Sequence, residues 1–218
     1  MPPVRRTRNR TTGEEEELPD ILVVTEDSVT EPTYIDNLRR HHRLPTVQVE
    51  ASSRSEPSSV VEYGLSEFLP DPANAGGEPE FDRLYCVFDR DEHAGFDDAV
   101  ERLRRIANNG RSVHWIYSIP CFEYWILLHF ENSGSLEYYE GSGSPCQAVV
   151  DDIESCSDSP IDDYESIKPD LFSETYQFVE TAIRHSTMRW SQHGGRNFDD
   201  YHPRTRMHEL IEHFQQIR

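Results

Sequence analysis

The sequence has 218 residues, a formal net charge of −20 and a mean hydropathy of −0.74, which fits one domain, with at most a small appended subdomain. No apolar run approaches the roughly 18 residues that a membrane-spanning helix needs, and the Arg- and Glu-rich start does not resemble a signal peptide. The four cysteines include no Cys-x-x-Cys pair, so we expect reduced thiols in the cytoplasm and no zinc site.

The acidic balance is unusual for a protein that contacts nucleic acid, because phosphate binding normally relies on basic residues. Of the 21 basic residues, only Lys168 is a lysine, and all the others are arginines. An acidic, nearly lysine-free surface is what we expect of a halophilic cytoplasm at molar salt, where charge repulsion is screened within about 3 Å. An acidic surface for a basic partner is the alternative explanation.

The salt interpretation predicts that the isolated protein is more stable in molar KCl than in dilute buffer. Screening should relieve the repulsion among its 41 acidic residues. The measurement is the melting temperature between 0.1 and about 2 M KCl, which we expect to rise. A melting temperature that falls steadily over this range would contradict the salt interpretation.

Residues 1–19 form a polar tail that we expect to be disordered. After this tail, the chain alternates short apolar runs with helical patterns. Strands are predicted over residues 20–25, 47–51, 84–91 and 113–119, and helices over 30–42, 58–68, 95–108 and 122–130. A Pro- and Gly-rich loop over residues 70–79 separates the second helix from the third strand. The alternation predicts a mainly parallel sheet with helices on both faces.

The composition changes after about residue 132. Residues 133–144 are rich in Ser and Gly, and residues 151–163 are acidic and weakly apolar, whereas 171–190 and 204–217 have amphipathic helical patterns. We therefore divide the chain into a tail (1–19), an α/β core (20–132) and a mainly helical C-terminal region (133–218) that packs on the core.

Acidic residues stand where two of the predicted strands end. The third strand runs into Asp89 and Asp91, and the first, Ile21-Leu-Val-Val-Thr25, stops at Glu26. Side chains two apart on a strand share a side, and ligands of open α/β sheets lie beyond the carboxyl ends of the strands. Clustered carboxylates suit a hard cation such as Mg²⁺. The alternative is that these acids only form turns or cap helices.

Two further glutamates stand close to these strand ends. Glu123 opens an apolar helix directly after the fourth strand, and we consider coordination and helix capping about equally good explanations. Glu31 stands at the start of the first helix, where we favour capping over a supporting place in the acidic cluster. His93, in the loop after Asp91, is a lone histidine and is not assigned a role.

Three blocks of the sequence resemble the RloB-like family. They are Ile21-Leu-Val-Val-Thr-Glu-Asp-Ser-Val-Thr-Glu-Pro-Thr-Tyr34, Val87-Phe-Asp-Arg-Asp91 and Ser118-Ile-Pro-Cys-Phe-Glu-Tyr-Trp-Ile-Leu-Leu-His-Phe130. A weaker block over residues 197–210 resembles the closing segment of the family. The resemblance implies a Toprim-like fold, the metal-dependent phosphoryl-transfer domain of topoisomerases, primases and some nucleases, and an association with restriction and phage-defence loci.

By position, Glu26 resembles the Toprim glutamate, and Asp89 with Asp91 resembles its Asp-x-Asp pair. The family usually has Gly after the glutamate, whereas this chain has Asp27, which either adds a carboxylate to the site or marks a less active copy. The resemblance also implies Mg²⁺ or Mn²⁺ as cofactor and, as a frequent partner, an ATPase of the ABC/AAA kind.

The sequence and the resemblance together predict a metal-dependent phosphodiesterase or nuclease in antiviral defence, including abortive infection. Glu26, Asp89 and Asp91 are the expected metal ligands, and Glu123 joins them as an expected catalytic residue. The substrate class stays open among DNA, RNA and nucleotides. The alternatives are a non-catalytic or partner-activated subunit and a purely acidic adaptor whose carboxylates point apart.

Overall fold

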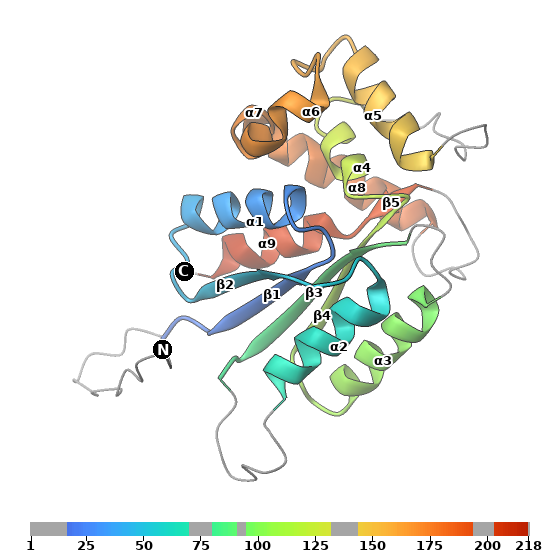
Figure 1. Ribbon diagram of the computed structural model, residues 1–218. Coiled ribbons are helices and arrows are strands. Elements are labelled where there is room, and N and C mark those ends of the chain that lie inside the picture. Colours follow the sequence, from blue (N-terminus) through green and yellow to red (C-terminus); the bar gives the residue numbers. More distant parts are fainter. Residues whose placement is uncertain (1–16, 70–79, 91–94, 132–143, 194–202, 218) are drawn as a thin grey trace.

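The computed structural model describes residues 17–69, 80–90, 95–131, 144–193 and 203–217. Most of the predicted tail, the loop over 70–79, Asp91, His93 and nearly all of the Ser- and Gly-rich segment fall outside these ranges. The described part is a mixed α/β fold built on one five-stranded sheet with the order β2-β1-β3-β4-β5 (Figure 1). The strands are β1 (Ile21–Thr25), β2 (Val47–Ala51), β3 (Arg83–Asp89), β4 (Val113–Ile119) and β5 (Arg204–Thr205).

The first four strands are parallel, and only β5 runs antiparallel to its neighbour β4. All five residues of β1 are buried, as expected for a central strand that is covered on both faces. The prediction of a mainly parallel sheet is therefore confirmed.

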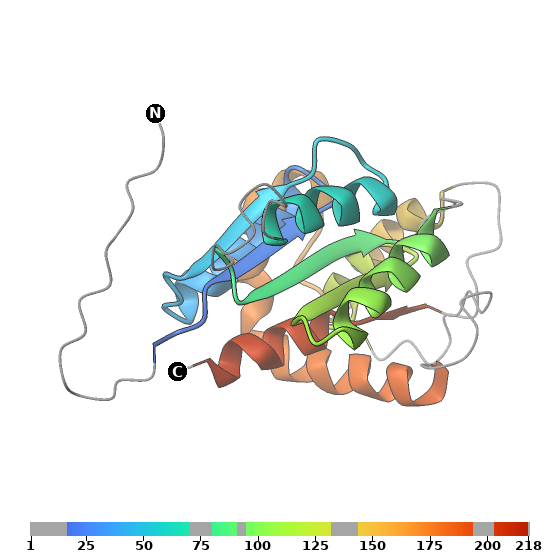
Figure 2. The same cartoon turned by 90° about the horizontal axis from the view of Figure 1, so that it is seen from below.

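Helices cover both faces of this sheet. The helices of the α/β part are α1 (Thr30–His41), α2 (Pro57–Phe68), α3 (Phe96–Asn108) and α4 (Glu123–Leu127). Figures 1 and 2 show α1 on one face, together with the C-terminal helix α9 (Met207–Gln216), and α2 with α3 on the other. Alternate residues of β1 follow this division, because Ile21 and Val23 join the core under α1, whereas Leu22 and Val24 join the core under α2 and α3.

The helix α2 lies close against β3 because it carries a glycine at the contact. A Cβ atom at Gly64 would stand 3.2 Å from Cys86 Sγ and 3.2 Å from Leu84 Cδ1. A larger residue at this position would therefore push the helix away from the strand that carries Asp89.

The C-terminal region is largely helical, as predicted, but its details differ from the expectation. Its elements are α5 (Pro145–Ser155), α6 (Tyr164–Ile167), η2 (Lys168–Asp170), α7 (Leu171–Thr175), η3 (Tyr176–Phe178) and α8 (Val179–His193), followed by β5 and α9. Part of the acidic segment is helical, since α5 buries Val149 and Ile153, four residues apart. The helix predicted over 171–190 is interrupted by η3, and the one predicted over 204–217 starts only after β5.

The strand β5 was missed because it has two residues and no apolar alternation. It is held by buried polar side chains instead. Ser118 and Thr205 share a hydrogen bond between their hydroxyl groups (2.9 Å), and Ser186 Oγ donates to the Thr205 carbonyl oxygen (2.9 Å) and lies 2.7 Å from His208 Nδ1. The last region of the chain therefore adds a strand to the sheet as well as packing helices on it.

A membrane-spanning segment was not expected. Among the helices in the described ranges, none combines the length and the apolar character that crossing a bilayer requires.

Candidate metal site at the carboxyl edge of the sheet

Glu26 and Asp89 meet where β1 and β3 end. The register pairs Thr25 with Val87, so the residue after β1 stands beside the end of β3. The Glu26 carboxylate (Oε2) accepts a hydrogen bond from the Asp89 backbone N–H at 2.9 Å, and the Glu26 N–H donates to the Val87 carbonyl oxygen at 3.0 Å. The structure thus brings together two of the three residues predicted to bind the ion, while Asp91 lies outside the described residues.

Glu31 belongs to the same cluster, although we expected it to cap α1. Its side chain is only 2% exposed. Glu31 Oε2 accepts hydrogen bonds from the backbone N–H groups of Glu26 (3.1 Å) and Asp27 (3.2 Å), rather than from the N–H groups of the helix. Glu31 therefore holds the loop between β1 and α1 in the conformation that presents Glu26.

Asp27 has a structural explanation in its own loop. Its Oδ1 accepts hydrogen bonds from the N–H groups of Ser28 (2.6 Å) and Val29 (3.2 Å), and its Oδ2 accepts one from Thr30 (2.5 Å). Both oxygens are thus engaged at the start of α1, where a negative charge also interacts favourably with the helix dipole. Asp27 closes the loop and does not point an unoccupied carboxylate at Asp89.

Glu123 is the first residue of α4, which follows β4 after a cis peptide bond between Ile119 and Pro120. Its carboxylate (Oε1) accepts a hydrogen bond from the Tyr164 hydroxyl at 3.1 Å, so this oxygen is directed to α6. Burial, together with the charge of Glu123, raises the pKa of Tyr164 well above its ordinary value, so this hydroxyl keeps its proton. The structure therefore favours a place in the cluster over capping for Glu123.

The carboxylates of the cluster repel one another. Burial and the charges of Glu31, Glu123 and Glu26 raise the pKa of Asp89 well above its ordinary value. The pKa of Glu31 is raised in the same way, by burial first and then by Glu26, Asp27 and Glu123, against a lowering by the Asp27 backbone N–H. The charges of Glu31, Glu123 and Glu26 therefore all act on Asp89.

One oxygen of Asp89 lacks a partner. Asp89 Oδ1 is shielded from solvent and accepts no hydrogen bond from any residue in the described part of the chain. A buried carboxylate oxygen without a donor is costly unless a proton or a cation compensates it. The residues present therefore fit a hard cation at Asp89 and Glu26, whose ligands are all oxygen atoms.

The described residues do not complete such a site by themselves. Over the ranges that the structure describes, no group of three His, Cys, Asp or Glu side chains has an arrangement that could hold a metal ion. Asp91, the third ligand predicted from the sequence, comes directly after the described range 80–90.

The comparison with protein families gives a match over most of the chain. The model of the family described as RloB-like protein matches residues 21–214. The chain belongs to the RloB-like family. Comparison with curated proteins and with solved structures found no significant match. The matched range contains the acidic cluster (Glu26, Glu31, Asp89 and Glu123), and also β5 and most of α9.

Sequence reasoning missed three residues next to the acidic cluster of this RloB-like protein. Tyr164 reaches it from α6 through its hydrogen bond to Glu123, and Cys146, in the first turn of α5, acts on the pKa of Asp89. The thiol of Cys146 interacts with that of Cys121, whose pKa is raised by burial, by this contact and by the charges of Glu123 and Asp89. Cys121 precedes Glu123 by two residues, so the sequence contained a signal for it, but no local pattern connects Tyr164 or Cys146 to the strands.

Proposed function

We propose that this RloB-like protein is a phosphodiesterase, most specifically a nuclease, that depends on Mg²⁺ or Mn²⁺. The observation that carries the proposal is the buried, unpartnered Asp89 Oδ1 beside the Glu26 carboxylate, at the edge of the sheet where α/β proteins bind ligands. Glu26, Asp89 and Asp91 would hold the ion. A bound divalent ion would stabilise negative charge on the transferred phosphoryl group and help to orient the nucleophile.

The side chains of the protein have separate tasks in this proposal. The Asp89 N–H fixes the Glu26 carboxylate, and Glu31 fixes the backbone of Glu26, so this carboxylate has one defined position. Glu26 would complete the coordination or exchange a proton with the reacting groups, since a positioned carboxylate can act as a general acid or base. Tyr164 holds Glu123 at the margin of the cluster, where it would serve as the second proton carrier.

The Toprim-like character and the place in antiviral defence rest on the resemblance of the three sequence blocks. The topology supports the Toprim-like character, because Glu26 directly follows β1 and Asp89 ends the adjacent parallel strand β3. Among the possible substrates, a nucleic acid fits the proposed reaction class best.

A second candidate is a partner-activated subunit that works with an ABC/AAA-type ATPase. It is favoured by the shielding of Asp89 Oδ1 from solvent, and burial with the neighbouring carboxylates raises the pKa of Asp89. Binding of the ATPase would then open the carboxyl edge of the sheet.

The test is a cleavage assay with the purified full-length chain. Single- and double-stranded DNA, RNA and nucleotides are incubated with Mg²⁺, Mn²⁺ or EDTA, with and without the ATPase if one is encoded beside the gene. We expect a divalent ion to be required and EDTA to abolish cleavage. Cleavage only in the presence of the ATPase would select the partner-activated subunit, whereas cleavage that persists in EDTA would contradict the metal-dependent mechanism.

A further inference from the structure

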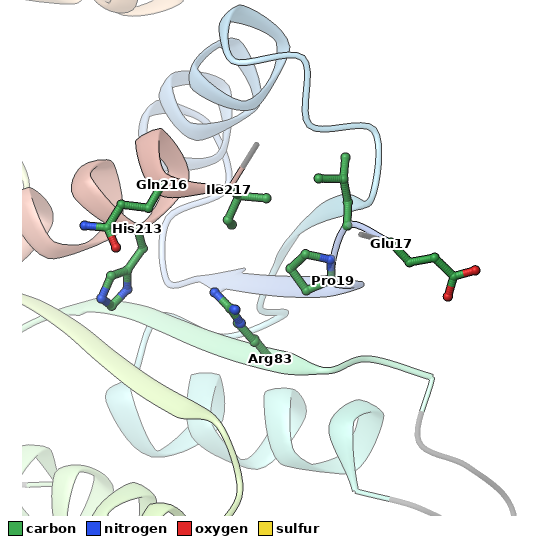
Figure 3. Close-up of a pocket in the computed structure, with 7 residues that line it drawn as sticks. Glu17, Pro19, Arg83, His213, Gln216 and Ile217 are labelled. Carbon is green, nitrogen blue, oxygen red and sulfur yellow. The ribbon is translucent and has the colours of Figure 1, made fainter. Parts of the chain in front are cut away.

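A concave site lies at the end of the sheet opposite to the acidic cluster, where β1 and β3 begin. It is a cavity of about 500 Å³ between the segment before β1, the first residue of β3 and the end of α9 (Figure 3), and its lining residues are Glu17, Leu18, Pro19, Arg83, His213, Gln216 and Ile217. This volume lies within the range of small-molecule sites, roughly 300–1,000 Å³. Because Arg83 and Asp89 stand at the two ends of β3, the cavity is separate from the acidic cluster.

The positive charge of this cavity comes from Arg83. It lies close enough to Tyr85 to lower the pKa of that hydroxyl, against the raising by burial. None of the ion pairs within the described residues involves Arg83. Figure 3 shows the Glu17 carboxylate directed away from the guanidinium group. In a chain with 41 acidic residues, an arginine that faces a cavity and forms no ion pair with a described residue is a candidate contact for an anion.

His213 adds a hydrogen-bond donor next to this charge. The Tyr85 hydroxyl lies 3.1 Å from His213 Nδ1, and the His114 ring stacks on Tyr85 with 4.5 Å between the ring centres. Burial lowers the pKa of His213, the charges of Glu209 and Glu212 raise it, and those of Arg83 and Arg206 lower it. When the Tyr85 hydroxyl donates to Nδ1, the neutral His213 ring carries its proton on Nε2, which is then a hydrogen-bond donor.

The remaining lining consists of the Glu17 carboxylate, which points away from Arg83, one amide and an apolar wall. Gln216 supplies the amide, while Leu18, Pro19 and Ile217 supply the apolar surface. The lining is more polar than apolar, and a guanidinium group beside a small apolar surface can hold a small organic anion. An inorganic anion would contact the polar groups of the site but not its apolar surface.

We propose that this cavity binds a small organic anion, whose carboxylate or phosphate group contacts Arg83 while its apolar body lies against Leu18, Pro19 and Ile217. A phosphate ester and a carboxylate offer Arg83 the same pair of oxygen atoms, so the experiment separates these two sources. The proposed phosphodiesterase activity at the other edge of the sheet does not depend on this site.

Calorimetric titration of the full-length protein with four probes tests the proposal. The probes are phenyl phosphate, benzoate, inorganic phosphate and benzyl alcohol. We expect saturable binding of one phenyl phosphate or one benzoate per chain, weaker binding of inorganic phosphate and no saturable binding of benzyl alcohol. The ratio of the affinities for phenyl phosphate and benzoate identifies the preferred oxyanion.

The variant Arg83→Gln should weaken binding of the aromatic anion by about tenfold or more, because it removes a charge-assisted hydrogen bond. Arg83→Lys, which keeps the charge but not the planar fork, should lose less. Arg102→Gln is the matched control, since Arg102 is exposed on α3, and it should bind as the wild type does. Equal binding of benzyl alcohol, unchanged affinity in a folded Arg83→Gln variant, or no binding of either aromatic anion at millimolar concentration would overturn the proposal.

Discussion

Asp89→Asn is expected to lower metal-dependent cleavage by the RloB-like protein at least about 100-fold, even with excess Mg²⁺ or Mn²⁺. The substitution nearly preserves the shape of the side chain but removes a negative charge from the position where the ion would bind, so the affinity for hard cations should fall as well. The backbone N–H of residue 89, which binds the Glu26 carboxylate, is retained. The measurements are cleavage rates and the calorimetric affinity for Mn²⁺.

The matched control is Glu62→Gln, which makes the same kind of change at an exposed position on α2. It should leave the cleavage rate and the Mn²⁺ affinity at the wild-type level. Glu31→Gln is unsuitable as a control, because Glu31 positions the loop that carries Glu26 and should itself reduce activity. If wild type and Asp89→Asn bind Mn²⁺ with equal affinity, Asp89 is not a metal ligand, whether or not the isolated chain cleaves nucleic acid.

The second large effect concerns stability and pH. Asp89 and Glu31 have pKa values raised above their ordinary values of 3.8 and 4.5. Above about pH 4 the unfolded chain releases these protons while the folded protein retains them, so their contribution to the free energy of unfolding falls as the pH rises towards the raised pKa values. Without metal, the contribution of the cluster to stability should therefore be less favourable at pH 8 than at pH 5.

The variant Asp89→Asn should reduce this loss. Each pKa unit of relief corresponds to about 1.4 kcal/mol, which for a domain of this size raises the melting temperature by roughly 3–6 °C. We therefore expect the variant, in EDTA at pH 8, to melt at a higher temperature than the wild type, and the difference to shrink at pH 5. Glu62→Gln controls for the general loss of one negative charge.

Divalent ions should stabilise the wild type more than Asp89→Asn, which is the reverse of the order expected in EDTA. A cation at the cluster would stabilise the wild type by about 2.7 kcal/mol at 100 times its Kd, whereas Asp89→Asn should gain much less. The measurement is thermal unfolding in Mn²⁺ against EDTA at pH 8. An equal shift in both proteins would indicate binding elsewhere on the acidic surface.

The sequence by itself determined the parallel part of the sheet and the position of two acids on it. Buried strands such as Ile21–Thr25 have continuous apolar runs, and their alternation with helical patterns restricts the connections to parallel strands. Because neighbouring parallel strands end at the same edge, Glu26 and Asp89 had to lie near each other once β1 and β3 were adjacent. The family blocks contain the same two residues, so the resemblance and the physical argument both place the predicted site at the carboxyl edge of the sheet.

Only the tertiary structure decided which other side chains surround these acids. Glu31 has the local sequence of a helix cap, but burial of its side chain directs it to the N–H groups of Glu26 and Asp27 instead. Tyr164 and Cys146 reach Glu123 and Cys121 from helices that are separated from them by other segments of the chain. The strand β5 likewise depends on hydrogen bonds of Thr205 with Ser118 and Ser186. Contacts of this kind follow from the packing of distant segments, which no local period or spacing encodes.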